Sequence, residues 1–230
     1  MKKILFTVCM IAGMGIFVLN ANAVMLGFGN ITGNNAANAA LGEEVLFVDV
    51  TEDADQAVFT FKNTDNSDTL TSLFISQIYF DDGSGFFANF SGFGNTSGTV
   101  NYKQDEKPGN LPGGNPYGFE TTDSFSPVKK GKGNSTRTSG IAAGETLGVY
   151  FNLNNGYTFE NILTALLDDS PSLRIGIHVQ GFGEDGGSES FITGNPTDPT
   201  EPTPEPATIL LLLTGLSGLG VTRARKNSKK

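Results

Sequence analysis

The chain of 230 residues has few of the side chains that most often carry chemistry, since it contains one cysteine, one histidine and no tryptophan. Cys9 lies inside an N-terminal apolar run, so disulfides and thiolate metal sites are excluded from the remainder of the chain. A single histidine, His178, also leaves few ligands for a transition metal. The absence of tryptophan weakens a carbohydrate-binding interpretation, in which aromatic side chains form the platform, without removing it.

Basic residues are scarce between the two ends of the chain. Two of them are Lys2 and Lys3, and five follow Val221, so residues 24–206 contain 8 basic against 24 acidic residues, a formal charge of −16. Such an acidic body argues against binding to nucleic acid or to an anionic membrane surface. It suits a soluble exported protein and leaves room for divalent cations.

The first 23 residues have the form of a secretory signal peptide. Lys2 and Lys3 precede an apolar run from Ile4 to Leu19, and Ala21-Asn22-Ala23 supplies small residues for cleavage. We therefore expect export through the Sec translocon and cleavage by signal peptidase after Ala23.

Residues 24–193 are predicted to form one domain. Apolar and polar residues alternate in segments typical of strands, namely 45–50, 56–63, 73–80, 86–90, 147–153 and 173–179. Thr158 is a plausible N-cap for one short helix that ends at Asp168. This pattern predicts a mainly β fold, an antiparallel β-sandwich of the jelly-roll or immunoglobulin-like kind, because a parallel sheet would need more helices.

Two segments of the domain show little periodicity. Residues 24–40, rich in Gly, Asn and Ala, are expected to form an irregular arm. Residues 92–140 are expected to be the loosest part, with short strands near Val100 and Phe119–Phe125 and a long surface loop. The basic cluster Lys129, Lys130 and Lys132 is interpreted as part of a solvated loop.

The last predicted strand contains the only histidine. We expect Leu173, Ile175, Ile177 and Val179 to face the core, and Arg174, His178 and Gln180 to face solvent. A hydrolase could combine His178 with Ser188 or Ser190 and Asp185, but no strand–turn–helix nucleophile motif surrounds these serines. A solvent-facing strand histidine is the interpretation we favour.

The best candidate for a metal site is Asp81-Asp82-Gly83, at the end of a predicted strand. Two carboxylates and loop carbonyls could bind Ca²⁺, which takes six to eight oxygen ligands. The alternative is an ordinary turn, because no twelve-residue calcium-binding loop is present. No other cofactor is expected.

The C-terminal part follows a three-part order. After a Pro/Thr/Glu spacer at 194–203 come Pro204-Glu205-Pro206, an uncharged apolar segment at 207–222 and a basic tail at 223–230. As a helix, 207–222 would measure roughly 24 Å, slightly less than a bilayer core of about 30 Å. Arg223, Arg225 and Lys226 should keep the tail on the cytoplasmic side, with the prolines outside.

This order resembles the PEP-CTERM sorting signal of Gram-negative bacteria. The resemblance implies recognition and cleavage near Pro204-Glu205-Pro206 by exosortase, an integral-membrane transpeptidase. It also implies a transient inner-membrane anchor and delivery to the cell surface or to the extracellular matrix, where exopolysaccharide and biofilm material would be partners. The alternative is a plain tail anchor.

The body is similar to a set of uncharacterised PEP-CTERM exported proteins. The phrases that carry this likeness include Ile78-Tyr79-Phe80-Asp81-Asp82-Gly83 and Arg174-Ile175-Gly176-Ile177-His178-Val179-Gln180-Gly181-Phe182. The resemblance implies no activity. We favour a non-enzymatic exported matrix protein; the alternatives are a carbohydrate- or calcium-binding adhesin module and a secreted hydrolase.

Overall fold

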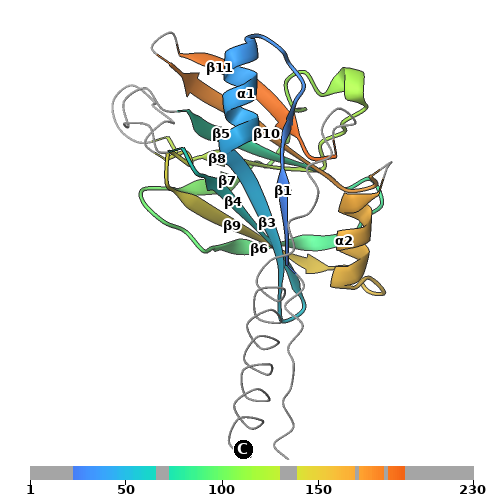
Figure 1. Ribbon diagram of the computed structural model, residues 1–230. Coiled ribbons are helices and arrows are strands. Elements are labelled where there is room, and N and C mark those ends of the chain that lie inside the picture. The colour runs from blue at the N-terminus through green and yellow to red at the C-terminus, as the bar shows by residue number, and fades with distance from the viewer. Residues whose placement is uncertain (1–22, 66–72, 130–138, 169–170, 184–185, 195–230) are drawn as a thin grey trace, which may run out of the picture.

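The computed structural model describes residues 23–65, 73–129, 139–168, 171–183 and 186–194 (Figure 1). The predicted signal peptide up to residue 22, and the spacer and sorting tail from residue 195 onward, lie outside the described residues. None of the described helices is long and apolar enough to cross a membrane.

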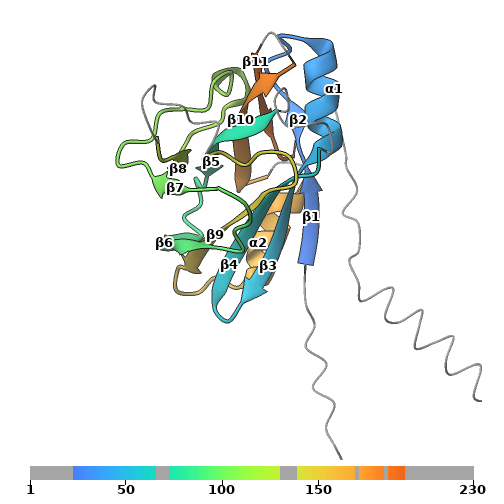
Figure 2. The same cartoon turned by 90° about the vertical axis from the view of Figure 1, so that its left-hand side faces the viewer.

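The body is mainly β and contains two antiparallel sheets, which is consistent with the predicted β-sandwich. One sheet has the strand order β1-β3-β4-β9-β6, and the other has the order β2-β11-β10-β5-β8-β7 (Figures 1 and 2). The strands of the first sheet are β1 (Ala23–Gly27), β3 (Leu46–Asp53), β4 (Gln56–Asn63), β9 (Thr146–Leu153) and β6 (Phe87–Gly94). Those of the second are β2 (Gly29–Asn30), β11 (Gly187–Ile192), β10 (Arg174–Phe182), β5 (Phe74–Asp81), β8 (Asp123–Pro127) and β7 (Tyr102–Gln104).

The strands form the main core because, along each of them, alternate apolar side chains point into the space between the two sheets. Phe80 of β5 lies near its centre, with ring centroids 5.0 Å from Phe59 of β4 and 4.9 Å from Phe151 of β9. Both pairs meet edge to face, an arrangement that adds to the energy of burial. The two sheets are therefore joined by phenylalanines, without thiols.

The predicted helix is confirmed as α2 (Phe159–Leu167). Its first turn is closed by a capping box, in which the Thr158 backbone N–H donates to the side chain of Asn161 at 2.9 Å. Phe159, Ile162 and Leu166 recur at three- and four-residue spacing and are buried. The helix thus covers one end of the core.

The prediction of an irregular arm at 24–40 is wrong, and so is the prediction of a single helix. This segment contains β1, β2 and the start of α1 (Ala36–Val45), which lies beside β11 at the opposite end from α2 (Figure 1). The Asn35 side chain caps α1 by accepting from the N–H groups of Ala37 and Asn38. Periodicity missed α1 because its residues are mostly small, and only Gly42 of the helix is fully buried.

A buried carboxylate orders the chain before α1. Glu189 of β11 has no exposed surface and accepts hydrogen bonds from Thr32 Oγ1 at 2.5 Å and from the N–H groups of Asn34 and Asn35 at 3.2 and 2.7 Å. Burial by itself would raise the pKa of Glu189. The hydrogen bonds, including one from Asn30, outweigh burial and hold the pKa below its ordinary value.

The expectation of a loose 92–140 region is also corrected in part. The segment before β8 contains a short 3₁₀ helix, η1 (Asn115–Tyr117), and buries Leu111 and Phe119 against Tyr79 on the outer face of the six-stranded sheet.

Arg174, which was expected to face solvent, instead pairs with Asp81 and donates to the Tyr117 carbonyl at 2.7 Å. Its guanidinium lies 5.3 Å from the centre of the Phe119 ring. These contacts attach the segment to β10.

Candidate functional site

Most of the predicted sorting residues lie outside the described residues, namely Ala21, Pro204, Glu205, Pro206, Arg223, Arg225 and Lys226. Ala23 is the first residue of β1 and pairs with Thr51. Cleavage after Ala23 would remove one residue from this strand and leave Val24, whose partner is Val50, at the new N-terminus.

The two aspartates of the calcium hypothesis have donors of their own. Asp82 accepts the N–H groups of Phe86 and Phe87, one on each carboxylate oxygen, both at 2.9 Å. Asp81 pairs with Arg174 and accepts the N–H of Glu120 at 3.2 Å. A calcium ion at this position would have to compete with all of these groups, so Ca²⁺ binding stays an untested hypothesis.

His178 is in contact with one of the serines considered for a hydrolase. It faces Ser190 across the β10–β11 pair, with Nδ1 at 3.1 Å from Oγ, and its Nε2 is 3.4 Å from the Gln180 amide nitrogen. Ser190 has no exposed surface, and Asp185 lies outside the described residues. Burial lowers the pKa of His178, although the charge of Glu189 opposes the shift.

This arrangement differs from that of an activated nucleophile. If the Gln180 amide donates to Nε2, the neutral imidazole carries its proton on Nδ1 and donates it to Ser190, so the ring does not act as the base for that serine. The expectation that His178 faces solvent is corrected to a half-buried ring between two neighbouring side chains.

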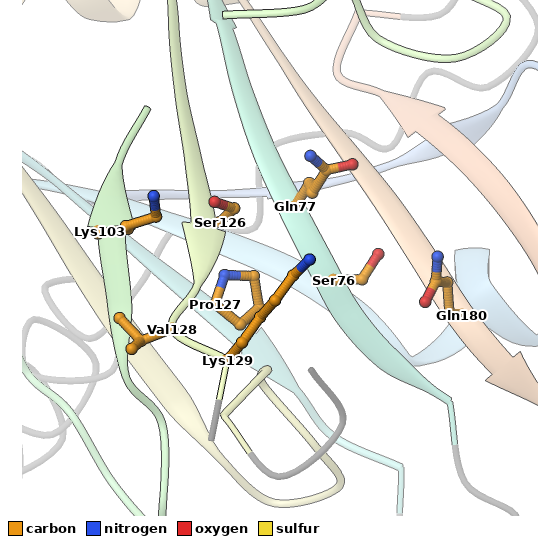
Figure 3. Close-up of a pocket in the computed structure, with 8 residues that line it drawn as sticks. All are labelled: Ser76, Gln77, Lys103, Ser126, Pro127, Val128, Lys129 and Gln180. Atoms are coloured by element: carbon orange, nitrogen blue, oxygen red, sulfur yellow. The ribbon is translucent and has the colours of Figure 1, made fainter. Parts of the chain in front are cut away.

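A cleft of about 700 Å³ lies on the six-stranded sheet, within the usual size range of ligand sites. It is lined by Gln180 of β10, by Ser76 and Gln77 of β5, by Lys103 of β7, by Ser126 and Pro127 of β8, and by Val128 and Lys129 after β8. Figure 3 shows these side chains rising from neighbouring strands around a common space.

The cleft exists because β5 and β8 stop pairing partway along their length. They pair only over Ile78–Phe80 and Asp123–Phe125, and beyond that point Ile75 bonds to Ile141 instead. Pro127 has no N–H with which to extend the ladder toward β5. A register shift between β5 and β10 also interrupts the regular alternation, and two consecutive residues, Ser76 and Gln77, face the cleft.

Hydrogen bonds within the protein fix what the cleft offers to a ligand. Ser76 Oγ donates to the His178 carbonyl at 2.8 Å, and Ser126 Oγ donates to Asp105 at 2.6 Å. Each serine therefore has lone pairs left to accept from a ligand. The Gln77 carbonyl oxygen accepts from Tyr79 Oη at 2.7 Å, which leaves the amide NH₂ of Gln77 as a donor.

The charged side chains of the lining are both positive. Among the described residues there are five basic side chains, and two of these, Lys62 and Arg174, are paired with Asp49 and Asp81. Two of the other three, Lys103 and Lys129, line the cleft, while Lys107 does not. The Asp105 carboxylate accepts hydrogen bonds from Ser126 of the lining and from Ser124, the latter at 2.9 Å. The cleft thus carries a local positive charge on an acidic body.

Comparisons with models of protein families, with curated proteins and with solved structures find no match to this chain.

Sequence reasoning did not find the cleft. It assigned Lys129 to a solvated loop, and Lys129 is indeed exposed, but the structure places it beside residues of β5 and β10. Lys130 and Lys132 lie outside the described residues. No local signal could have joined Lys103, Gln77 and Gln180, because strand pairing alone brings these three positions together.

Proposed function

We propose that this chain is an exported, non-catalytic β-sandwich protein that is sorted through its C-terminus to the cell surface or extracellular matrix of a Gram-negative bacterium. The observation that carries the proposal is the order Pro204-Glu205-Pro206, apolar segment 207–222 and basic tail 223–230. In this proposal exosortase cleaves the tail after the segment has rested in the inner membrane. The displayed body then associates with exopolysaccharide of the matrix.

The contacts of His178 favour a non-catalytic body over a hydrolase. The serine nearest to this ring is fully buried, and the side chain within reach of its second nitrogen is the neutral amide of Gln180. A hydrolytic triad needs an accessible nucleophile and a group that stabilises the imidazolium as it forms.

Within the sandwich class, the strand order favours a jelly roll over an immunoglobulin-like fold. The neighbours β4–β9 and β5–β10 are each five strands apart in chain order, and β6–β9 and β5–β8 are each three apart. Two Greek keys folded over each other produce such pairings, because successive strands pass between the two sheets. The jelly roll says nothing about activity, which depends on sites carried by the fold.

The sorting proposal is tested by changing Pro204 and Pro206 together to Ala in the native host. The expected result is accumulation of a longer species in the inner-membrane fraction, with less of the mature form outside the cell. A matched control changes Pro199 and Pro202, which lie in the predicted spacer, to Ala and should leave processing intact. A mature product of normal size and yield from the Pro204/Pro206 variant would remove the exosortase interpretation.

The role of the basic tail is tested separately. Replacing Arg223, Arg225, Lys226, Lys229 and Lys230 with Asp should reduce correct insertion, because positive flanks hold the cytoplasmic side. Unchanged processing of this variant would contradict the proposed orientation.

The cleft gives a specific reason to keep a second candidate function, a carbohydrate-binding adhesin module of the matrix. It is large enough for a sugar unit and combines hydrogen-bond donors with acceptors.

A further inference from the structure

We propose that the cleft between β5, β7, β8 and β10 binds an acidic sugar unit, a uronate residue of a polysaccharide. The inference rests on the proposed function only for the source of the ligand, the surrounding matrix. The binding itself is a property of the described body.

The charge of the lining selects an anion. Lys103 and Lys129 are exposed at their positions, and neither forms an ion pair with a described carboxylate. Both side chains line the same cleft, so an anionic ligand bound there would be attracted by two positive charges. The negative charge of Asp105, which is hydrogen-bonded to Ser126 of the lining, reduces the net positive charge of the cleft, so a single carboxylate is a better match than a multiply charged group.

The neutral side chains add the features that distinguish a sugar acid from a simple anion. Ser76 and Ser126 have already donated their protons and can accept from ligand hydroxyl groups, whereas the amide NH₂ of Gln77 can donate to them. A simple anion without hydroxyl groups, such as sulfate, would use the donors and leave these acceptors unmatched. Pro127 and Val128 supply an apolar surface for the C–H groups of a sugar ring.

The structure also pre-positions several of these groups. Tyr79 holds the Gln77 amide in one orientation, and Ser76 is fixed to the β10 backbone. Groups that are fixed before binding lose less conformational entropy when the ligand arrives. The two lysines at the rim are the groups that would become ordered on binding.

The test uses the full chain purified in detergent micelles and titrated by calorimetry with trigalacturonate. The matched neutral ligand is the methyl ester of the same trisaccharide. We expect the ester to bind about tenfold more weakly than the acid, because it cannot form the two charge contacts with the solvent-exposed lysines. The double variant Lys103→Gln/Lys129→Gln should weaken trigalacturonate binding by a similar factor, because it removes the same two contacts. Raising the salt concentration should also weaken binding of the acid and have little effect on the ester.

Lys107→Gln is the matched control, because it removes an exposed positive charge outside the lining. It should leave the affinity within about twofold of the wild type. An equal loss in the control and in the double variant would overturn the assignment to this cleft. Equal affinity for acid and ester, or no binding of trigalacturonate up to about 10 mM, would overturn the ligand class.

Two further outcomes separate this proposal from its rivals. Tighter binding of an oligodeoxythymidylate than of trigalacturonate, lost in the double variant, would replace the sugar acid with a phosphodiester ligand. Because the titration uses unprocessed protein, failure of the sorting experiment would leave the binding result intact, and failure of binding would leave the sorting result intact. The comparison of acid with ester on the wild-type chain stands even if the double variant folds poorly.

Discussion

Gly42 of α1 lies directly against the tip of the Phe191 ring, and a Cβ atom built on Gly42 would be 2.3 Å from Phe191 Cζ. Phe191 belongs to β11 and has no exposed surface, so its ring has little freedom to move away. The absence of a side chain at one helical position therefore allows α1 to close one end of the sandwich.

Gly42→Ala should destabilise the protein. Alanine is the better helix former by about 1 kcal/mol, but overpacking a filled core costs about 1–3 kcal/mol. Because the Cβ would be only 2.3 Å from Phe191 Cζ, we expect the cost to lie at the upper end of this range. The net loss in the free energy of unfolding, measured by urea denaturation, should be about 2 kcal/mol.

Gly109→Ala is the matched control, because a Cβ on Gly109 would meet nothing within 4 Å. It should change the free energy of unfolding by less than about 0.5 kcal/mol. A Gly42→Ala protein as stable as the wild type would show that α1 does not press on Phe191 as described.

The two ion pairs of the described body should differ in their effect on stability. The Arg174 and Asp81 side chains are 18% and 11% exposed, whereas those of Lys62 and Asp49 are 35% and 23% exposed. Asp81→Asn should cost about 2 kcal/mol or more, because it leaves a largely buried guanidinium without its counter-charge. Asp49→Asn should cost less than about 1 kcal/mol. Equal losses in urea denaturation would contradict the structural role given to Arg174.

The effect of Ca²⁺ on thermal unfolding tests the metal hypothesis for the Asp81-Asp82-Gly83 turn. Both carboxylate oxygens of Asp82 already accept backbone N–H groups, so we expect added Ca²⁺ to leave the thermal unfolding midpoint of the wild type unchanged. A rise in the midpoint with Ca²⁺ that is absent in Asp82→Asn would instead support the metal hypothesis.

The free energy of unfolding should decrease at acidic pH, because His178 binds a proton more readily in the unfolded chain than in the folded protein. The pKa of His178 in the fold is lower than that in the unfolded chain, about 6.5, so between these two values the unfolded chain binds more protons. The free energy of unfolding should therefore decrease as pH falls below about 6.5 and should level off, for this group, below the pKa in the folded state.

Because His178 is the only histidine, His178→Gln should remove this part of the pH dependence. Urea denaturation of both proteins between about pH 5 and 8 measures the difference, and the imidazole proton resonances give the pKa directly. Parallel profiles for the two proteins, or a pKa above that of a free histidine, would show that the ring is not desolvated as described.

Several features followed from the sequence alone. Alternation of apolar residues predicted β4 with the bounds Gln56–Asn63, and it placed Ile175, Ile177 and Val179 in the core. Three- and four-residue spacing behind Thr158 predicted α2. These patterns repeat within a few residues, so each of these elements can be predicted from its own segment without knowledge of tertiary contacts. The three-part order of the C-terminus is likewise local, and it supports the sorting proposal without help from the fold.

Other features were decided only by the tertiary structure. α1 shows almost no apolar stripe, and its position depends on contact between Gly42 and Phe191, which are far apart in the chain. The cleft needs residues from four strands, brought together by the order β10-β5-β8-β7 and opened where β5 and β8 part. Long-range pairing of this kind leaves no periodic trace in the sequence, because it depends on which strands meet and not on the pattern within any one of them.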